Sequence, residues 1–198
     1  MRTQKQIAAL IFVVLLCLTL ADSQARAAAP DDGWQLSIPL TLTAGAYVIS
    51  SNKHSDSFNS LNGSAELLLS SPRQPVSAAL FVDYHYSPDE QYNGIFNTGG
   101  YAKYQGSRWD TTVALFSHDG PASSDLWAFA GRVRYRFAEN HKVGVEFVGA
   151  LRDASAPDLA FGYYGDILNS LSIKITAGAN FKTGSKRAAR TELVWQFN

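Results

Sequence analysis

Residues 125–137, DLWAFAGRVRYRF, decide the fold because apolar and polar residues alternate through them. From Trp127 onward, every second residue is apolar, aromatic or glycine. The positions between them include Arg132, Arg134 and Arg136. Successive side chains of a β-strand point to opposite faces, so this stretch predicts a strand with one apolar face and one cationic face. Such a strand suits a wall that separates lipid from a polar interior.

The same alternation recurs in segments separated by loops rich in Ser, Asn, Asp, Gly and Pro. Most segments have 10–13 residues, which is closer to the roughly 9–11 of a tilted membrane strand than to the roughly 5–6 of a soluble one. We therefore expect an all-β fold, a closed antiparallel up-and-down transmembrane β-barrel of about ten strands. Eight strands is the alternative, because the eighth segment is short and contains Gly162 and Gly165. The segments are residues 34–49, 60–70, 76–87, 94–105, 108–117, 125–137, 141–152, 158–165, 169–182 and 187–197.

Charge separates cleanly between the two faces of these segments. A charge on a lipid-facing side costs about 2–4 kcal/mol at the bilayer midplane for Arg or Lys, so a lipid-facing surface has to be free of charge. A soluble β-sandwich or lipocalin-like barrel, with its apolar face turned inward, is the alternative. The residues assigned to the charged face are Glu66, Asp83, Lys103, Asp110, Arg132, Arg134, Arg136, Lys142, Glu146, Arg152, Asp158, Lys174, Lys182, Arg190 and Glu192.

Loop lengths and aromatic residues predict the orientation of the barrel. Tight turns are expected at 71–75, 106–107, 138–140 and 166–168, and mostly longer polar loops at 50–59, 88–93, 118–124 and 153–157. Short periplasmic turns and longer outer loops would place both termini in the periplasm. Two girdles of interfacial aromatics fit this orientation. The periplasmic girdle is Trp34, Tyr104, Trp109, Tyr135, Phe137, Trp195 and Phe197, and the outer girdle is Tyr84, Tyr86, Phe96, Trp127, Phe161 and Phe181.

The N-terminal segment has the pattern of a secretory signal. Arg2 and Lys5 precede an uncharged apolar run, and Ala25 and Ala27 offer small residues for a signal peptidase. The run is shorter than the roughly 20 residues of a spanning helix, so cleavage is favoured over an uncleaved anchor. The prediction is a signal peptide at residues 1–27 and a barrel domain at residues 28–198.

Cleavage would leave a chain without cysteine or methionine. Residues 1–27 hold three of the 17 basic residues and one of the 17 acidic ones, which leaves 14 basic against 16 acidic residues. This balance argues against nucleic acid as a partner, because nucleic-acid binding calls for a basic stripe. No motif for a metal or another cofactor is recognised, and a thiolate zinc site would need cysteines.

The last residues, RTELVWQFN at 190–198, alternate and lead to an aromatic residue. This run resembles the terminal strand signal of bacterial outer-membrane β-barrels, although Asn198 follows the phenylalanine. The resemblance implies a location in the outer membrane of a Gram-negative bacterium, with lipid as the solvent of the barrel. It also implies periplasmic chaperones and the barrel-assembly machinery as partners during biogenesis, the latter through Leu193, Trp195 and Phe197. No narrower family is indicated.

The inward charges suggest what the barrel holds. A ten-stranded barrel has a backbone radius of about 10 Å, so inward side chains fill much of it. Like charges two residues apart need partners, and we expect Glu66, Asp83, Asp110, Glu146 or Glu192 to pair with the arginines and with Lys174 and Arg190. A structural or narrow-bore barrel with a salt-bridged interior is the first interpretation. A small anion-favouring pore lined by the arginines is the alternative.

Two further function classes have weaker signals. A hydrolase or acyltransferase site at the outer rim would use His54, Ser55 and Asp56, or His118 and Asp119. These are also ordinary polar loop residues, so the protein is predicted more as a non-enzyme than as an enzyme, with no catalytic residue assigned. His85 beside Asp83 is read as an interior histidine. An adhesin or scaffold would depend on loops that are short here.

Overall fold

The computed structural model describes residues 33–51, 55–88, 93–120, 123–150, 158–180 and 186–197. The expected signal peptide at 1–27 lies outside these ranges, as do His54, Arg152, Phe181, Lys182 and Asn198. No helix within the described ranges is long and apolar enough to cross a membrane. The strands are β1 (Gln35–Ser37), β2 (Leu40–Ser51), β3 (Ser55–Ser70), β4 (Val76–Tyr86), β5 (Ile95–Gln105), β6 (Trp109–Gly120), β7 (Ser123–Ala138), β8 (His141–Ala150), β9 (Asp158–Leu168), β10 (Leu171–Asn180) and β11 (Lys186–Phe197).

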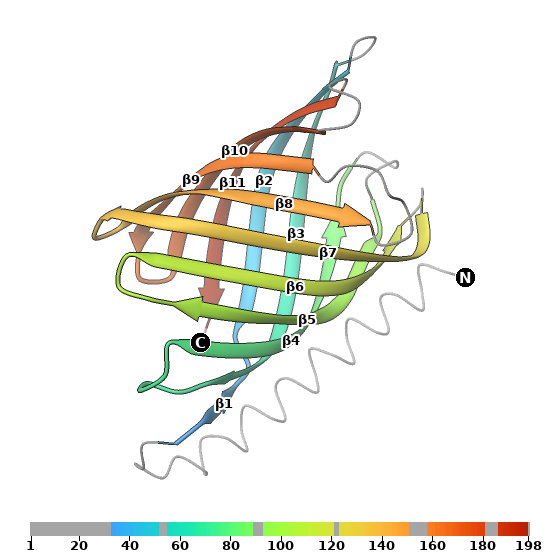
Figure 1. Cartoon of the computed structure of the whole chain (residues 1–198). Helices are drawn as coiled ribbons and strands as arrows, with labels where there is room; N and C mark the ends of the chain where they lie inside the picture. The colour runs from blue at the N-terminus through green and yellow to red at the C-terminus, as the bar shows by residue number, and fades with distance from the viewer. Residues whose placement is uncertain are drawn as a thin grey trace.

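The sheet closes on itself. From β2 to β11 each strand pairs antiparallel with the next one in the chain, and β11 returns to pair with β2. In Figure 1, β4 to β8 form the near wall, and β2, β3, β10 and β11 run behind them. The described strands therefore form a closed up-and-down barrel of ten strands, in which β1 is the first part of β2. Ten strands are confirmed, and the eight-stranded alternative is wrong.

Proline explains why the first strand has two parts. Gln35 lies opposite Ser70 and Leu40 lies opposite Ala65, so β1 and β2 follow β3 in one register. Pro39 has no N–H to donate to a ladder, which interrupts the strand there. Its carbonyl still accepts a hydrogen bond from the Glu66 N–H at 3.1 Å. The first segment expected from the sequence is thus one interrupted strand.

Several strands are longer than the alternation predicted. Residues 55–59 belong to β3 and residues 118–120 to β6, so most of the expected loops at 50–59 and 118–124 are strand. Ser, Asn and Asp are loop residues by composition, but a hairpin that extends beyond the lipid is exposed to water on both faces and accepts them. The turn expected at 166–168 is also wrong. β9 continues to Leu168, with an irregular register at the start of β10, and the turn follows at residues 169–170.

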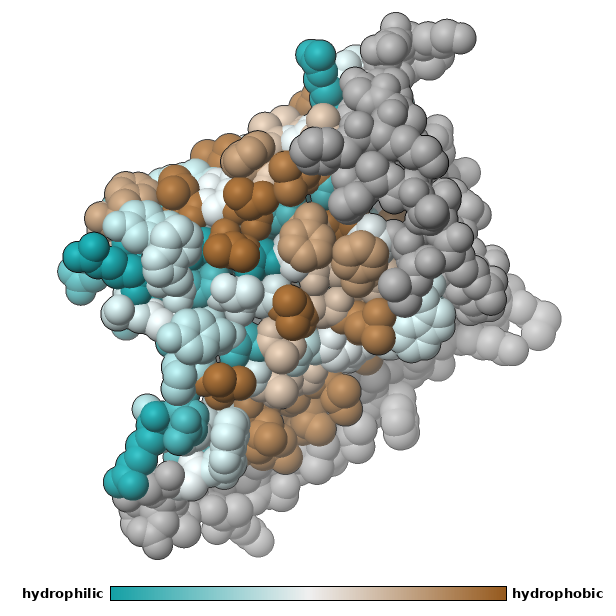
Figure 2. Space-filling model, viewed as in Figure 1, coloured by the Kyte–Doolittle hydropathy of each residue, from teal (hydrophilic) through white to brown (hydrophobic). Residues whose placement is uncertain are grey.

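Burial is inverted relative to a soluble protein. Among the described residues, the buried charged side chains are Asp110, Glu146 and Glu192, whereas buried apolar residues are few and mostly alanine. Large apolar side chains are instead exposed, with Leu80 at 64% and Phe161 at 65%. Brown side chains cover much of the outer surface in Figure 2, and teal ones gather at its left edge, where the turns of the near wall lie in Figure 1. An apolar exterior around a charged interior suits a barrel in lipid, so the soluble alternative is wrong.

Aromatic rings cover two glycines on the outer face. Gly131 lies opposite Phe147, and Gly149 lies opposite Phe129. A Cβ atom added to Gly131 would overlap the ring of Phe147, and one added to Gly149 would lie 2.6 Å from the Phe129 ring. The two rings lie 6.0 Å apart and are tilted. Packing an aromatic ring over a cross-strand glycine restores the contact area that the glycine lacks, and it fixes the register of β7 against β8.

Candidate functional site

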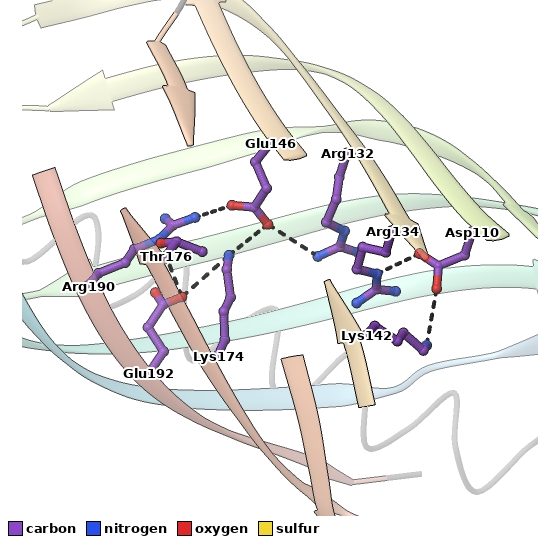
Figure 3. A network of polar contacts seen from close by, with 9 residues as sticks. All are labelled: Asp110, Arg132, Arg134, Lys142, Glu146, Lys174, Thr176, Arg190 and Glu192. Atoms are coloured by element: carbon purple, nitrogen blue, oxygen red, sulfur yellow. Dashed lines mark hydrogen bonds and ion pairs between the residues drawn. The ribbon is translucent and has the colours of Figure 1, made fainter. Parts of the chain in front are cut away.

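The inward faces of β7, β8, β10 and β11 carry a network of ions, which we call the ionic wall (Figure 3). Glu146 on β8 lies at its centre. Its carboxylate accepts a hydrogen bond from Arg190, lies 3.0 Å from Lys174 Nζ and lies 3.8 Å from Arg132 Nη1. One carboxylate thus joins β7, β10 and β11 to β8. The sequence predicted charged side chains on these faces, but not which of them would meet.

Glu192 extends the network to the seam where β11 meets β2. Its carboxylate lies 3.4 Å from Lys174 Nζ and 3.6 Å from Arg190 Nε. The Tyr47 hydroxyl donates to Glu192 at 2.5 Å. Arg190 Nε also donates to Thr176 Oγ1 at 2.7 Å. The buried carboxylate therefore has two cations and a hydroxyl around it, which is what a charge removed from water requires.

A second cluster lies nearer the short-turn end of the barrel. Asp110, which is 3% exposed, follows the first residue of β6. Its carboxylate accepts a 2.5 Å hydrogen bond from Arg134 Nε and lies 3.1 Å from Lys142 Nζ. The aromatic ring of Tyr164 packs between the two clusters, with Arg134 at 5.1 Å and Lys174 at 5.9 Å from the ring centre. These cation–π contacts add to the carboxylate partners that both cations already have.

Glycines make room for this crowding. Gly144 and Gly162 are neighbours in one register row that runs from Arg134 to Thr176. A Cβ atom at Gly144 would overlap the backbone oxygen of Val133 and lie 2.8 Å from Arg134 Cγ, and one at Gly162 would lie 2.8 Å from Thr176 Cγ2. The side chains of the ionic wall occupy the space that these two positions leave open.

Two basic side chains at the short-turn end have no carboxylate. No ion pair to Lys103 or Arg136 is found in the described part of the chain, and Arg136 Nε is buried without an acceptor there. Both residues line a cavity of about 610 Å³ that the turns after β3 and β5 border. The three arginines of β7 therefore differ, because Arg132 and Arg134 join the carboxylates and Arg136 does not.

The opposite side of the interior is aromatic, and we call Phe58, Phe81, Tyr101 and Phe116, on β3 to β6, the aromatic wall. Phe81 lies 6.3 Å from the Tyr101 ring and 6.2 Å from Phe116, while Phe58 stacks on Tyr47 at 5.0 Å. The acidic residues here meet neutral partners: Glu66 accepts from Tyr101 at 2.5 Å, and Asp83 accepts from Asn97 at 2.6 Å. The structure thus does not bring Glu66 and Asp83 to the arginines.

The catalytic candidates are not brought together as a dyad. His118 and Asp119 are consecutive in β6, so their side chains point to opposite faces. His118 Nδ1 instead lies 2.7 Å from Asn97 Oδ1. Ser55 and Asp56 are exposed at the start of β3, and His85 packs edge-on to Tyr47 at 6.1 Å.

The sequence reading missed the neutral members of the interior. Tyr47, Tyr101, Tyr164, Thr176 and Asn97 all hold or contact ions, yet they were not singled out. The alternation does place them on the inward face, because each lies two residues from an inward glycine or lysine of the same strand. Polar aromatics at such positions can be searched for in other barrels.

Leu193, Trp195 and Phe197 lie on the outer face of β11, in register with Ala44, Leu42 and Leu40 of β2. Phe197 is 55% exposed. At the same rim Trp109 and Tyr135 face each other across β6 and β7 with 4.8 Å between ring centres, and Trp34, Tyr104 and Phe137 are exposed. Tyr86, Trp127 and Phe161, from the other expected girdle, are exposed as well.

No protein-family model matches the sequence, and no curated protein matches it either. Among solved structures, the KdgM porin in complex with disordered oligogalacturonate has a TM-score of 0.51 at 8% identity, and the match covers 80% of this chain and 99% of that one. The KdgM porin has a TM-score of 0.47 at 8% identity, covering 81% and 99%. An outer membrane channel from Pseudomonas putida F1 has a TM-score of 0.40 at 9% identity, covering 86% and 100%.

At such identities the likeness to the KdgM complex is one of fold. It agrees with the closed antiparallel barrel, the exposed apolar exterior and the buried charges described above. An apolar exterior of this kind belongs in lipid, and closed barrels are one of the two structures that can span it. The chain is therefore an integral membrane β-barrel, and its fold is that of the outer-membrane porin it resembles.

Proposed function

We propose that the protein is a narrow-bore channel that favours small anions. The observation that carries this proposal is an excess of basic over acidic side chains inside the barrel, and the excess remains when Glu66 and Asp83 beside the aromatic wall are counted. The two ionic clusters and the cavity beside them contain seven basic side chains and three carboxylates: Lys103, Arg132, Arg134, Arg136, Lys142, Lys174 and Arg190 against Asp110, Glu146 and Glu192. Rings of basic side chains select for anions in pores.

The ionic wall supplies the constriction. Arg190 and Lys174 reach Glu146 from β11 and β10, and Arg132 reaches it from β7. The cavity of about 610 Å³ lies at the short-turn end, and another of about 410 Å³, lined partly by Tyr47, Thr176 and Arg190, extends toward the opposite end. These two cavities, separated by the closely packed ions of the ionic wall, support a short and narrow path for ions through the barrel.

Single-channel recording in planar bilayers tests the proposal. In a KCl gradient we expect small currents whose reversal potential shows a preference for chloride. Arg190→Gln removes a cation of the constriction and should shift that potential toward zero, whereas the exposed turn variant Arg73→Gln should leave it unchanged. A folded barrel without current above the lipid background would overturn the channel and leave the structural, salt-bridged barrel.

A second candidate is passage of an acidic sugar. The aromatic wall lies across the interior from the ionic wall, so a solute that enters would meet rings on one side and cations on the other. Sugar rings stack on aromatic faces, and carboxylates pair with arginine. The oligogalacturonate named for the KdgM complex is a solute of this class. D-Galacturonate should then reduce the chloride current more than neutral D-galactose does, and equal effects would contradict the idea.

The location of the two termini in the periplasm is part of the proposal. Short turns at residues 139–140 and 169–170 lie at the rim where β11 ends, which supports it. The mature sequence has no cysteine, so single cysteines report cleanly. In intact cells a membrane-impermeant maleimide should label Asp56→Cys and spare Arg108→Cys. The reverse pattern would invert the orientation.

Export and assembly complete the proposal. Cleavage after Ala27 would be read from the N-terminal sequence of the purified barrel. Leu193, Trp195 and Phe197 lie on one lipid-facing stripe of β11, which supports recognition of this strand by the assembly machinery. Phe197→Ala should lower the amount of folded barrel in the outer membrane more than Phe137→Ala, an exposed aromatic at the same rim. Equal amounts would contradict a terminal signal.

A further inference from the structure

The cavity at the short-turn end has the size and lining of a ligand site. Its volume of about 610 Å³ falls within the roughly 300–1,000 Å³ of small-molecule pockets. Ser70, Ser77 and Gln105 contribute hydroxyl and amide groups from the ends of β3, β4 and β5, and the turns at 71–75 and 106–107 form its edge. It is the polar mouth of the barrel rather than part of the ionic wall.

Two cations face this cavity without an anion. Arg136 comes from β7 and Lys103 from β5, on either side of β6. The buried carboxylate nearby, Asp110, already binds Arg134 and Lys142. Neither Lys103 nor Arg136 has a carboxylate partner within the described ranges, and Arg136 Nε is buried there without an acceptor. A buried arginine donor without a partner is rare in proteins and needs an acceptor, which the oxygen of a bound anion would supply.

We infer that this mouth is an anion-binding vestibule, in which Arg136 and Lys103 hold the phosphate or carboxylate group of a small solute. The planar guanidinium supplies paired donors that match an oxyanion, and the lysine supplies a point charge. This end of the barrel holds four basic side chains, Lys103, Arg134, Arg136 and Lys142, and one buried carboxylate, Asp110, so its net positive charge attracts anions before contact. The inference goes beyond the proposed channel, because binding does not require passage.

Titration calorimetry of the folded barrel in octyl glucoside, with inorganic phosphate as the probe, tests the site directly. Wild type should bind phosphate saturably, and Arg136→Gln should bind about tenfold more weakly, as expected for one lost charge-assisted hydrogen bond. Lys103→Gln should also weaken binding. Arg108→Gln, which removes an exposed charge from the same rim but does not line the cavity, should bind as wild type does. Succinate, as a carboxylate probe, should show the same order of variants.

The outcomes separate the site from the channel. Saturable binding in a barrel that carries no current would keep the vestibule and overturn the channel, while current without binding would do the opposite. Binding of equal strength in all three variants, or none in wild type, would overturn the vestibule. A heat-modifiability gel shows that each variant is folded, and Lys103→Gln keeps the test decisive if Arg136→Gln fails to fold. Phosphatidylglycerol, added to the same micelles in a further titration, distinguishes a lipid headgroup from a free solute. Binding of the lipid with no binding of free phosphate would contradict a solute site.

Discussion

The two walls of the interior differ in the partners that their buried acidic residues have. Beside the aromatic wall, two acidic residues each accept from one neutral side chain: Glu66 from Tyr101, and Asp83 from Asn97. In the ionic wall, Glu146 alone contacts three cations from three strands. A side chain of the aromatic wall can therefore change with local consequences. A change in the ionic wall leaves several charges without a partner at once.

The largest effect should come from breaking the centre of the ionic wall. Glu146→Gln removes the carboxylate that Arg132 contacts and leaves Lys174 and Arg190 with Glu192 alone. We expect it to destabilise the barrel by about 3–5 kcal/mol, the usual cost of breaking a buried ion pair. Urea unfolding of the barrel in lipid vesicles, followed by tryptophan fluorescence, measures this.

Glu66→Gln is the matched control, because the amide oxygen still accepts the hydrogen bond from Tyr101. We expect a loss of about 1 kcal/mol. If the two variants lose the same stability, the contrast between the walls does not exist.

A smaller effect should appear on the outer face of the strands behind the ionic wall. Gly131→Ala forces the ring of Phe147 away from its place over β7, at a cost of about 1–3 kcal/mol for an overpacked site. Gly63→Ala, on β3, meets nothing within 4 Å and should be neutral. The same unfolding midpoints test both, and a neutral Gly131→Ala would show that the ring moves freely.

A substitution in the aromatic wall should lower the free energy of unfolding but leave the charge selectivity of the channel unchanged. Phe81→Leu removes ring contacts with Tyr101 and Phe116 and should cost about 1 kcal/mol. The reversal potential in a KCl gradient should stay that of wild type. A shift as large as that of Arg190→Gln would mean that both walls set the selectivity.

The smallest effect belongs to the rim. His141 stacks on Tyr163, and its Nδ1 lies 2.7 Å from the tyrosine hydroxyl, both near water. Tyr163→Phe should change the unfolding free energy by no more than about 0.5 kcal/mol, as for other surface substitutions. A larger loss in the same urea titration would show that the rim stabilises the ionic wall beneath it.

The sequence predicted the strands and their faces because alternation reports directly which side of a sheet a residue occupies. On that basis Trp127 was correctly predicted to face outward and Arg132 to face the interior. The loops at 50–59 and 118–124 were misread, since Ser and Asp fit an exposed hairpin as well as a loop.

The sequence alone could not predict which inward side chains of the site contact one another. Alternation does not report height in the barrel or the reach of a side chain, so Glu146 and Arg190, 44 residues apart, could not be matched in advance. Asp83 was expected near the arginines, but Asn97 lies opposite it on the neighbouring strand and donates a hydrogen bond to its carboxylate.

The seam between β2 and β11 differs from every other junction of the barrel in its route along the chain. Phe197 lies opposite Leu40 and Lys186 opposite Ser51, whereas the other strands of the ring meet their chain neighbours. Hairpins form from local contacts, but this ladder has to wait until both ends of the chain have arrived, and such distant pairings are the slow events of folding. The time that the barrel takes to form is therefore governed at the seam. Until β11 pairs with β2, both strands have an open edge, and a strand of another chain could pair with either of them.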